Sequence, residues 1–380
     1  MHTIIRITLV SALVGLSFII GPEAQASSRF KRLLQKVEKE AKNFAHSIET
    51  KGKNFGEKVE YEYKKIVKRD LPDCPLELVQ EAATYAKIVE ANTLQDASEI
   101  NVPNFSILNI FKTTEISPED LEAIDEQLEP FAIDNLLLVH SERNELLKTL
   151  QTIAHDSPEV FLQYFFNETN HDTGRVVSLE DRIEDNTPNL KLALEGFGVR
   201  ARIFKNNHEP CLILAFRGTD YDIFNNTARM LQNISTNIWQ GGGGCSLAYE
   251  FAYLITYALM HAFPEDTIEC TGHSLGGGLA AFSGAALRLK AFCFNDPNLA
   301  DCSLDRIFLE NPEAVHNHFD PPIVHVHIEG ELLNRATPWL PGKKLGYQCD
   351  IPRQGGSSSP VKLHSSSTVA ANILAFIENN

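Results

Sequence analysis

The fold prediction for this chain begins with the segment Thr271-Gly272-His273-Ser274-Leu275-Gly276-Gly277-Gly278-Leu279-Ala280. Residues 266–270 before it are typical of a short buried strand, and residues 279–289 after it are rich in Ala and Leu, which favours a helix. Ser274 is therefore predicted at a sharp strand-to-helix corner, where side chains larger than those of Gly272 and Gly276 would collide. Such a corner exposes a serine hydroxyl as a nucleophile in front of the free N–H groups of a helix. The alternative is a glycine-rich loop without a chemical role.

The amino terminus has the pattern of a secretory signal peptide. His2 and Arg6 give it a weakly basic start, residues 7–20 are apolar, and Ala24-Gln25-Ala26 is a small-x-small ending. A membrane anchor is the alternative, but the apolar run is shorter than the roughly 20 residues that span a bilayer. We therefore predict a signal peptide at residues 1–26 and an exported protein, secreted or periplasmic. The mature chain would keep 380 − 26 = 354 residues, enough for one large α/β domain.

Residues 27–72 differ in composition from the rest of the chain. The formal charge is −16, yet residues 27–70 contain 13 Lys or Arg against 7 Asp or Glu. Apolar residues recur there at steps of three and four, which predicts a basic amphipathic helical arm. The arm is expected to pack on the acidic body of the protein or to form a helical hairpin, and contact of residues 27–70 with an anionic membrane surface is the alternative. Nucleic-acid binding is not expected from an exported chain whose body is this acidic.

The rest of the chain divides into a helical region, residues 73–170, and a catalytic core, residues 171–380. The helical region shows apolar periodicity and helix-start signals in four segments, residues 76–94, 118–128, 136–154 and 160–166. It is expected to pack on the sheet or to cap a substrate cleft. The sheet is expected to begin at Gly196, with a hairpin made by residues 198–204 and 211–216.

Seven cysteines follow the signal peptide, and the odd number leaves at least one unpaired or bonded to another chain. Cys293 and Cys302 bracket a polar loop and are the predicted disulfide. Cys211 and Cys270 lie in apolar runs and are expected to be small buried hydrophobes. No spacing among the cysteines is typical of a metal site.

A second motif, Phe216-Arg217-Gly218-Thr219-Asp220, ends the predicted strand at residues 211–216. When a serine attacks an acyl carbonyl, negative charge develops on the carbonyl oxygen and must meet fixed hydrogen-bond donors. The backbone N–H of Leu275, the residue after the nucleophile, can be one such donor. The N–H and the hydroxyl of Thr219 can supply the others, so these two residues are the predicted oxyanion hole.

The two motifs, Phe-Arg-Gly-Thr and, 53 residues later, Gly-His-Ser-Leu-Gly-Gly, make the chain resemble the class 3 (fungal-type) lipase group of the α/β-hydrolase superfamily. The resemblance covers the chain from about Gly196 to its end. It implies an α/β-hydrolase fold with a central, mostly parallel sheet, here preceded by a helical N-terminal region. It also implies a triglyceride lipase, phospholipase A1 or related carboxylester hydrolase, with Ser274 as nucleophile and Thr219 plus Leu275 as oxyanion hole.

The general base is predicted to be His364, because the superfamily order places the acid and then the histidine after the serine. His364 follows the Gly/Ser-rich residues 355–359 and precedes a predicted final helix at residues 367–378. His325 and His327 alternate along the predicted strand at residues 323–328, so they point to one face of it. They are expected to be hydrogen-bonded sheet residues rather than a metal pair, since no third ligand is evident at a useful spacing.

The acid is predicted to be Glu331, just past the strand at residues 323–328, where the resemblance implies a Gly-Asp pair and this chain has Gly-Glu. Asp296, at the end of the preceding strand at residues 290–295, is the alternative acid. Glu329 and Asp320 are further candidates.

The combined prediction is an exported serine carboxylester hydrolase that acts on lipid acyl esters through an acyl-enzyme. No cofactor and no metal is required. Two alternatives remain open: an acyltransferase that uses the same residues, and a non-catalytic protein on a hydrolase fold that binds a membrane or a partner.

Overall fold

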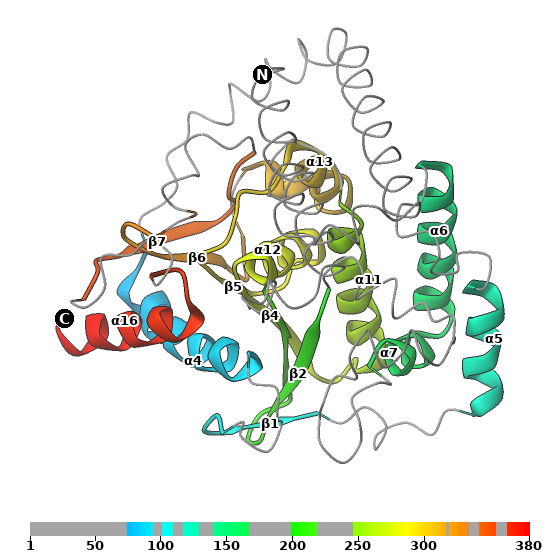
Figure 1. Ribbon diagram of the computed structural model, residues 1–380, viewed down its shortest axis with the longest axis horizontal. Coiled ribbons are helices and arrows are strands. Elements are labelled where there is room, and N and C mark those ends of the chain that lie inside the picture. Colours follow the sequence, from blue (N-terminus) through cyan, green and yellow to red (C-terminus); the bar gives the residue numbers. More distant parts are fainter. Residues whose placement is uncertain are drawn as a thin grey trace, which may run out of the picture. The chain divides into compact units, whose positions relative to one another are not determined.

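The computed structural model describes ten segments, all within one compact unit, Leu71–Asn380 (Figure 1). They are residues 74–93, 101–108, 117–128, 140–166, 199–218, 246–316, 319–331, 333, 342–354 and 363–380. The predicted signal peptide, the basic arm and Thr219 lie outside the described residues. Among the described helices, none has the length and apolar character to cross a bilayer.

The core is a seven-stranded mixed sheet in which the strands lie in the order of the sequence. The strands are β1 (Phe105–Ile107), β2 (Ala201–Asn206), β3 (Cys211–Phe216), β4 (Thr267–His273), β5 (Ala291–Phe294), β6 (Ile323–Ile328) and β7 (Tyr347–Ile351). β1 and β2 pair antiparallel, as do β2 and β3, and every pair from β3 to β7 is parallel. Strands β3 to β6 are almost wholly buried; β3 and β5 have continuous apolar sequences, whereas β4 and β6 also bury polar residues.

Helices cover both faces of the sheet, so the core has three layers (Figure 1). Successive strand residues contribute to opposite layers: Leu214 and Phe216 pack with the first helix group, and Ile213 and Ala215 with the second. The first group comprises α5 (Pro118–Leu128), α6 (His140–Asp156), α7 (Pro158–Phe166), α11 (Leu247–Ala262), α12 (Leu275–Leu287) and α13 (Asp301–Glu310), followed by the short helix η6 (Pro312–His316). The second group comprises α4 (Leu76–Asn92) and α16 (Ser366–Glu378).

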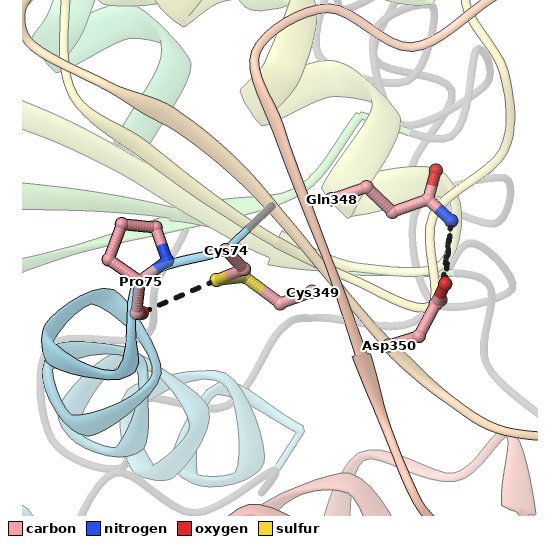
Figure 2. Close-up of a disulfide and its surroundings, with 5 residues drawn as sticks. All are labelled: Cys74, Pro75, Gln348, Cys349 and Asp350. Carbon is pink, nitrogen blue, oxygen red and sulfur yellow. Dashed lines mark hydrogen bonds between the residues drawn. A yellow bond between two sulfur atoms is a disulfide. The ribbon is translucent and has the colours of Figure 1, made fainter. Parts of the chain in front are cut away.

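Helix α4 is tied to the sheet at its start and along its length. Figure 2 shows the disulfide between Cys74, just before α4, and Cys349 on β7. Further along, the Tyr85 hydroxyl donates a hydrogen bond to Glu269 of β4, and its ring stacks on Phe292 of β5 with centroids 4.2 Å apart. The first helix of the region at residues 73–170 therefore packs directly on the sheet.

The predicted disulfide between Cys293 and Cys302 is wrong. Cys293 lies on β5 with a buried free thiol, whereas Cys302 takes part in a different disulfide. A disulfide requires Cα atoms about 4.4–6.8 Å apart, and the short distance in sequence between the two cysteines does not establish that separation. Cys211 and Cys270 carry free thiols, and Cys270 is fully buried.

The predicted fold class is confirmed: the sheet is mostly parallel and helices cover both faces. Helices α4 to α7 lie close to the predicted segments, and β6 has the predicted bounds. The expectation that the sheet begins at Gly196 is wrong, because β1 from the helical region pairs with the outer side of β2. Strand β7, between β6 and the predicted histidine loop, was also not predicted.

Candidate functional site

Ser274 stands at the corner between β4 and α12 in a rare backbone conformation, φ 56° and ψ −127°. A non-glycine residue held at positive φ costs on the order of 1–3 kcal/mol, so the surroundings must enforce it. The Ser274 N–H donates to the carbonyl of Phe294 on β5 (2.9 Å), and the Ser274 carbonyl accepts from the Gly278 N–H (3.2 Å). The serine is therefore fixed between the neighbouring strand and the first turn of the helix.

The glycines at this corner are set by close approaches of the backbone. A Cβ atom added at Gly272 would lie 2.2 Å from the Gly276 carbonyl oxygen, and one at Gly276 would lie 2.3 Å from the carbonyl oxygen of Phe216 on β3. A side chain at position 276 would therefore collide with the adjacent strand β3, and not with Gly272 across the corner. Sequence reasoning gave no role to two more glycines, which leave room for neighbouring buried side chains. Gly277 lies against Asp296, and Gly278 lies against Tyr249.

The structure brings Ser274, His364 and Glu331 together in one line of hydrogen bonds. His364 Nε2 lies 2.9 Å from Ser274 Oγ, and His364 Nδ1 lies 2.8 Å from Glu331 Oε2. A carboxylate only accepts, so Nδ1 carries the proton and Nε2 is free to accept from the serine hydroxyl. Both Glu331 and His364 are buried.

Glu331 is held as a carboxylate. Burial alone would raise its pKa, but the His327 and His364 imidazoles and the N–H of Leu333, 2.8 Å from Oε2, outweigh burial and lower the pKa to about 2. At neutral pH this carboxylate is therefore ionised beside the His364 ring.

Two residues that sequence reasoning missed hold the His364 segment in place. The ring of His273, next to Ser274 in the sequence, donates from Nε2 to the backbone carbonyl of His364. Burial lowers the pKa of His273 to about 3, so this ring stays neutral. Asn295 donates to the Leu363 carbonyl (3.1 Å) and accepts from the N–H of Ile328, at the end of β6 (3.0 Å). Asn295 thus links the segments that carry the histidine and the acid.

Asp296, the alternative acid, forms no hydrogen bond or ion pair with His364 in the described part of the chain, and its side chain is fully buried. Its Oδ2 accepts from His325 Nδ1 and from Lys344 Nζ, both at 2.9 Å, and its Oδ1 lies 3.3 Å from His327 Nε2. Lys344 and His325 hold the pKa of Asp296 well below its usual range, against burial, which would raise it. Glu329 and Asp320, the remaining candidates, have exposed side chains.

The argument that His325 and His327 lack a third metal-binding partner is wrong, because Asp296 brings a carboxylate oxygen within 4.8 Å of both rings. The three residues nevertheless do not fit a metal ion. His325 uses both ring nitrogens, the second donating to the Leu345 carbonyl at 2.7 Å, and the Lys344 ammonium already supplies a positive charge to Asp296.

The predicted oxyanion donors are described in part. Leu275 is the first residue of α12, and the N–H groups of the first helical turn have no acceptor within their own helix. Thr219 lies outside the described residues. Gly218, the residue before it, contacts the corner closely: a Cβ added there would lie 2.5 Å from the His273 carbonyl oxygen and 3.3 Å from Ser274 Cβ. The end of β3 therefore runs directly beside Ser274.

Comparisons with known proteins find similarity to phospholipases and lipases. Residues 165–337 match the model of a Tle-like phospholipase domain, a phospholipase-like family. The chain is 32% identical over 119 residues to an extracellular phospholipase A1 of Serratia liquefaciens, covering 31% of this chain and 34% of that protein. It is 26% identical over 219 residues to a Mycosarcoma maydis protein named "Putative lipase ATG15", covering 48% of this chain and 41% of that protein. The chain thus spans less than half the length of these curated relatives.

Among solved structures, a triacylglycerol lipase from Penicillium expansum matches with 14% identity and a TM-score of 0.27, over 42% of this chain and 66% of that one. Independently of that match, the described core has the arrangement expected of an α/β-hydrolase fold: a sheet that is parallel from β3 to β7, helices on both faces, and Ser274 at a strand-to-helix corner. The similarities to phospholipases and lipases confirm the predicted resemblance to the class 3 lipase group.

Proposed function

We propose that the protein is an exported serine hydrolase that cleaves lipid acyl esters with Ser274 as nucleophile, His364 as base and Glu331 as acid. The observation that carries the proposal is the line of two hydrogen bonds, 2.9 Å and 2.8 Å, that joins these residues at a corner where Ser274 has positive φ. A nucleophile, a base and an orienting carboxylate in this order are the parts that acyl transfer requires.

In the proposed reaction, Ser274 Oγ attacks the ester carbonyl while His364 Nε2 takes the hydroxyl proton. The ring becomes an imidazolium, which Glu331 stabilises through the bond to Nδ1. The Leu275 N–H and Thr219 donate to the oxyanion of the tetrahedral intermediate. His364 then returns the proton to the leaving alcohol, and an acyl-enzyme remains. A water molecule, deprotonated by His364, attacks the acyl group, and His364 returns that proton to Ser274 Oγ as the fatty acid is released.

The substrate class and the location rest on separate observations. The similar proteins are named as a lipase and a phospholipase A1, and the latter is named as extracellular, which supports a lipid ester and export. The Cys74–Cys349 disulfide supports an oxidising compartment. Residues 27–70 are expected to pack on the acidic body of the protein, and the alternative is that they contact anionic membranes. Under that alternative, deleting these residues would lower turnover of anionic vesicles but leave a short soluble ester unaffected.

The test compares the mature chain with Ser274→Ala on short and long nitrophenyl esters, a triglyceride emulsion and phosphatidylglycerol vesicles. Ser283→Ala is the matched control, because Ser283 lies in α12 with a buried hydroxyl that has no hydrogen-bond partner among the described residues. We expect Ser274→Ala to abolish turnover and Ser283→Ala to retain it. Turnover that survives in Ser274→Ala, or a folded wild-type chain inactive on every substrate, would contradict the proposal. The preferred substrate separates lipase from phospholipase.

A further inference from the structure

The carboxyl end of helix α4 is joined to the carboxyl end of strand β3 by side chains from both elements. The buried amide of Asn92, the last residue of α4, donates from Nδ2 to the Ala215 carbonyl at 2.9 Å. In the reverse direction, Arg217, the residue after β3, donates from Nη2 to the carbonyl of Thr93, directly after the helix, at 3.0 Å. The proposed mechanism gives neither contact a role.

The end of α4 favours positive charge. The last carbonyls of a helix have no N–H partner within it, and the aligned peptide dipoles leave partial negative charge there. The last turn of α4, which the structure describes in full, holds no basic residue. Arg217 and Arg202 of β2 bring the charge instead, and Arg202 Nη1 lies 3.5 Å from the Asn92 carbonyl oxygen. Burial and, after it, the charge of Arg217 lower the pKa of Arg202 to about 10, so this guanidinium stays charged at neutral pH.

The backbone of Arg217 lies against the nucleophile corner. A Cβ atom added at Gly276, in the first turn of α12, would lie 2.8 Å from the Arg217 carbonyl carbon. The next residue, Gly218, is the one whose added Cβ would lie 3.3 Å from Ser274 Cβ. One position further along the chain is Thr219, a proposed oxyanion donor. A shift of the Arg217 backbone would therefore move the chain that runs beside the nucleophile.

We propose that Arg217 is a positioning residue: by holding the end of β3 on the carboxyl end of α4, it fixes the chain that leads past Ser274 to the oxyanion donor. This inference rests on the proposed function, in which Thr219 is one of the donors. Asn92 acts in the same direction from the helix. Helix α4 lies outside residues 165–337, the region that matches the phospholipase-like family, so a helix from outside that region supports the proposed site.

The proposal predicts a loss in kcat rather than in KM, because negative charge reaches the oxyanion donors only in the transition state. Outright removal of one donor costs about 10²–10³ in kcat. Arg217→Met keeps the donors but loosens their support, so we expect a smaller fall in kcat, about thirtyfold, with KM changed less than about twofold. An alkyl boronic acid, which binds a serine oxygen as a tetrahedral anion, should lose affinity by about the same factor as kcat.

The control variant is Arg202→Met, which removes a guanidinium from the same helix end. Arg202 lies on β2, and β3 separates that strand from β4 and the Ser274 corner. The assay measures kcat, KM and boronic acid affinity of the mature chain on a soluble nitrophenyl ester, with the free energy of unfolding from urea titration. Both variants should lose stability, whereas kcat and boronic acid affinity should fall only in Arg217→Met. Unchanged kcat in Arg217→Met, or an equal fall in Arg202→Met, would overturn the inference and leave the proposed function intact.

Two further measurements keep the inference testable if Arg217→Met does not fold or if the wild type is inactive. Asn92→Ala removes the contact to the Ala215 carbonyl and should lower kcat about threefold, and an unchanged kcat would overturn the inference. A folded wild-type chain without turnover would contradict the proposed function instead. Amide hydrogen exchange of residues 216–218 requires no substrate. It should be faster in Arg217→Met than in Arg202→Met, and equal rates would overturn the support of β3 by Arg217.

Discussion

Comparing the variants Glu331→Gln and Asp296→Asn tests which of the two carboxylates orients His364 and stabilises its charged form. Glutamine keeps the size of Glu331 and removes its charge. In the transition state, His364 becomes an imidazolium whose Nδ1 lies 2.8 Å from the carboxylate oxygen. With charge centres about 4 Å apart and an effective dielectric constant of about 20, the attraction is about 4 kcal/mol. At about 1.4 kcal/mol per factor of ten, kcat should fall about 1,000-fold. The glutamine amide can also donate to Nδ1, which would leave the proton on Nε2 and block acceptance from Ser274.

Asp296→Asn should reduce stability more than it reduces kcat. Asp296 forms no hydrogen bond with His364 among the described residues but binds Lys344 and His325, so its loss leaves a buried ammonium without its counter-charge. Removing one partner of a buried ion pair costs about 3–5 kcal/mol of stability. The fall in kcat should be about tenfold, transmitted through His327 and Glu331. Activity thus suffers most in Glu331→Gln, and stability suffers most in Asp296→Asn.

The assay is kcat and KM on a soluble nitrophenyl ester at pH 8, with the free energy of unfolding from urea titration. Glu269→Gln is the control, because Glu269 is a buried carboxylate of the same sheet paired with Lys290 at 3.3 Å, and it lies at the opposite end of β4 from Ser274. It should lose stability and keep kcat. A larger loss of kcat in Asp296→Asn than in Glu331→Gln would refute the assignment and make Asp296 the acid.

Three further changes have expected outcomes. Asn295→Leu should cost about 2–4 kcal/mol of unfolding free energy, because the Leu363 carbonyl and the Ile328 N–H lose their partner. The value of kcat should also fall, because the His364 segment loses this support. Calorimetry measures the change in stability, and steady-state kinetics measure the change in kcat. The pKa of Glu331 is lowered to about 2, so its ionisation stabilises the folded chain above pH 4.5, and this stabilisation should be lost as the pH falls towards 2. Urea titrations at several pH values should therefore show that the unfolding free energy of Glu331→Gln declines less steeply with falling pH than that of the wild type. Replacing Cys74 and Cys349 by alanine opens a loop spanning 275 residues and should lower the unfolding free energy by about 3–5 kcal/mol in urea titration, with kcat unchanged, because neither residue contacts the site.

The parts of the fold that sequence could predict are those with a strong local signal. The strand, corner and helix around Ser274 depend on neighbours within a few positions, and β6 reads as a strand because all six of its residues are apolar or histidine. Strand β1 has only three residues, with Ser106 exposed between two half-buried neighbours, so it has too few positions to show a period. In β7, Gln348 and Asp350 interrupt the apolar pattern, since this outer strand is partly exposed.

Some residues of the candidate site could be predicted from the sequence, and others could not. His364 and Glu331 could be ranked from their order after Ser274, because chain order limits which loops reach one edge of a parallel sheet. His273 and Asn295 could not be recognised as supports, since each reaches a backbone group 91 or 68 positions away. A contact to a backbone carbonyl requires no particular residue at the far end, and it therefore leaves no signal in the sequence.

Glu331, and not Asp296, reaches His364 because of the turn at Gly330-Glu331, directly after β6. The Glu331 N–H donates to the Ile328 carbonyl at 3.1 Å, and Gly330 between them has φ 83°. These are the features of a tight turn that requires glycine at its third position. The turn folds the chain back directly after β6 and places the Glu331 backbone near the sheet edge, from which the longer glutamate side chain reaches His364. Asp296 follows β5 without such a turn, and its short side chain points instead to β6 and Lys344. The extra methylene of glutamate, relative to the aspartate that the resemblance implies at this position, is thus matched by the backbone that carries it.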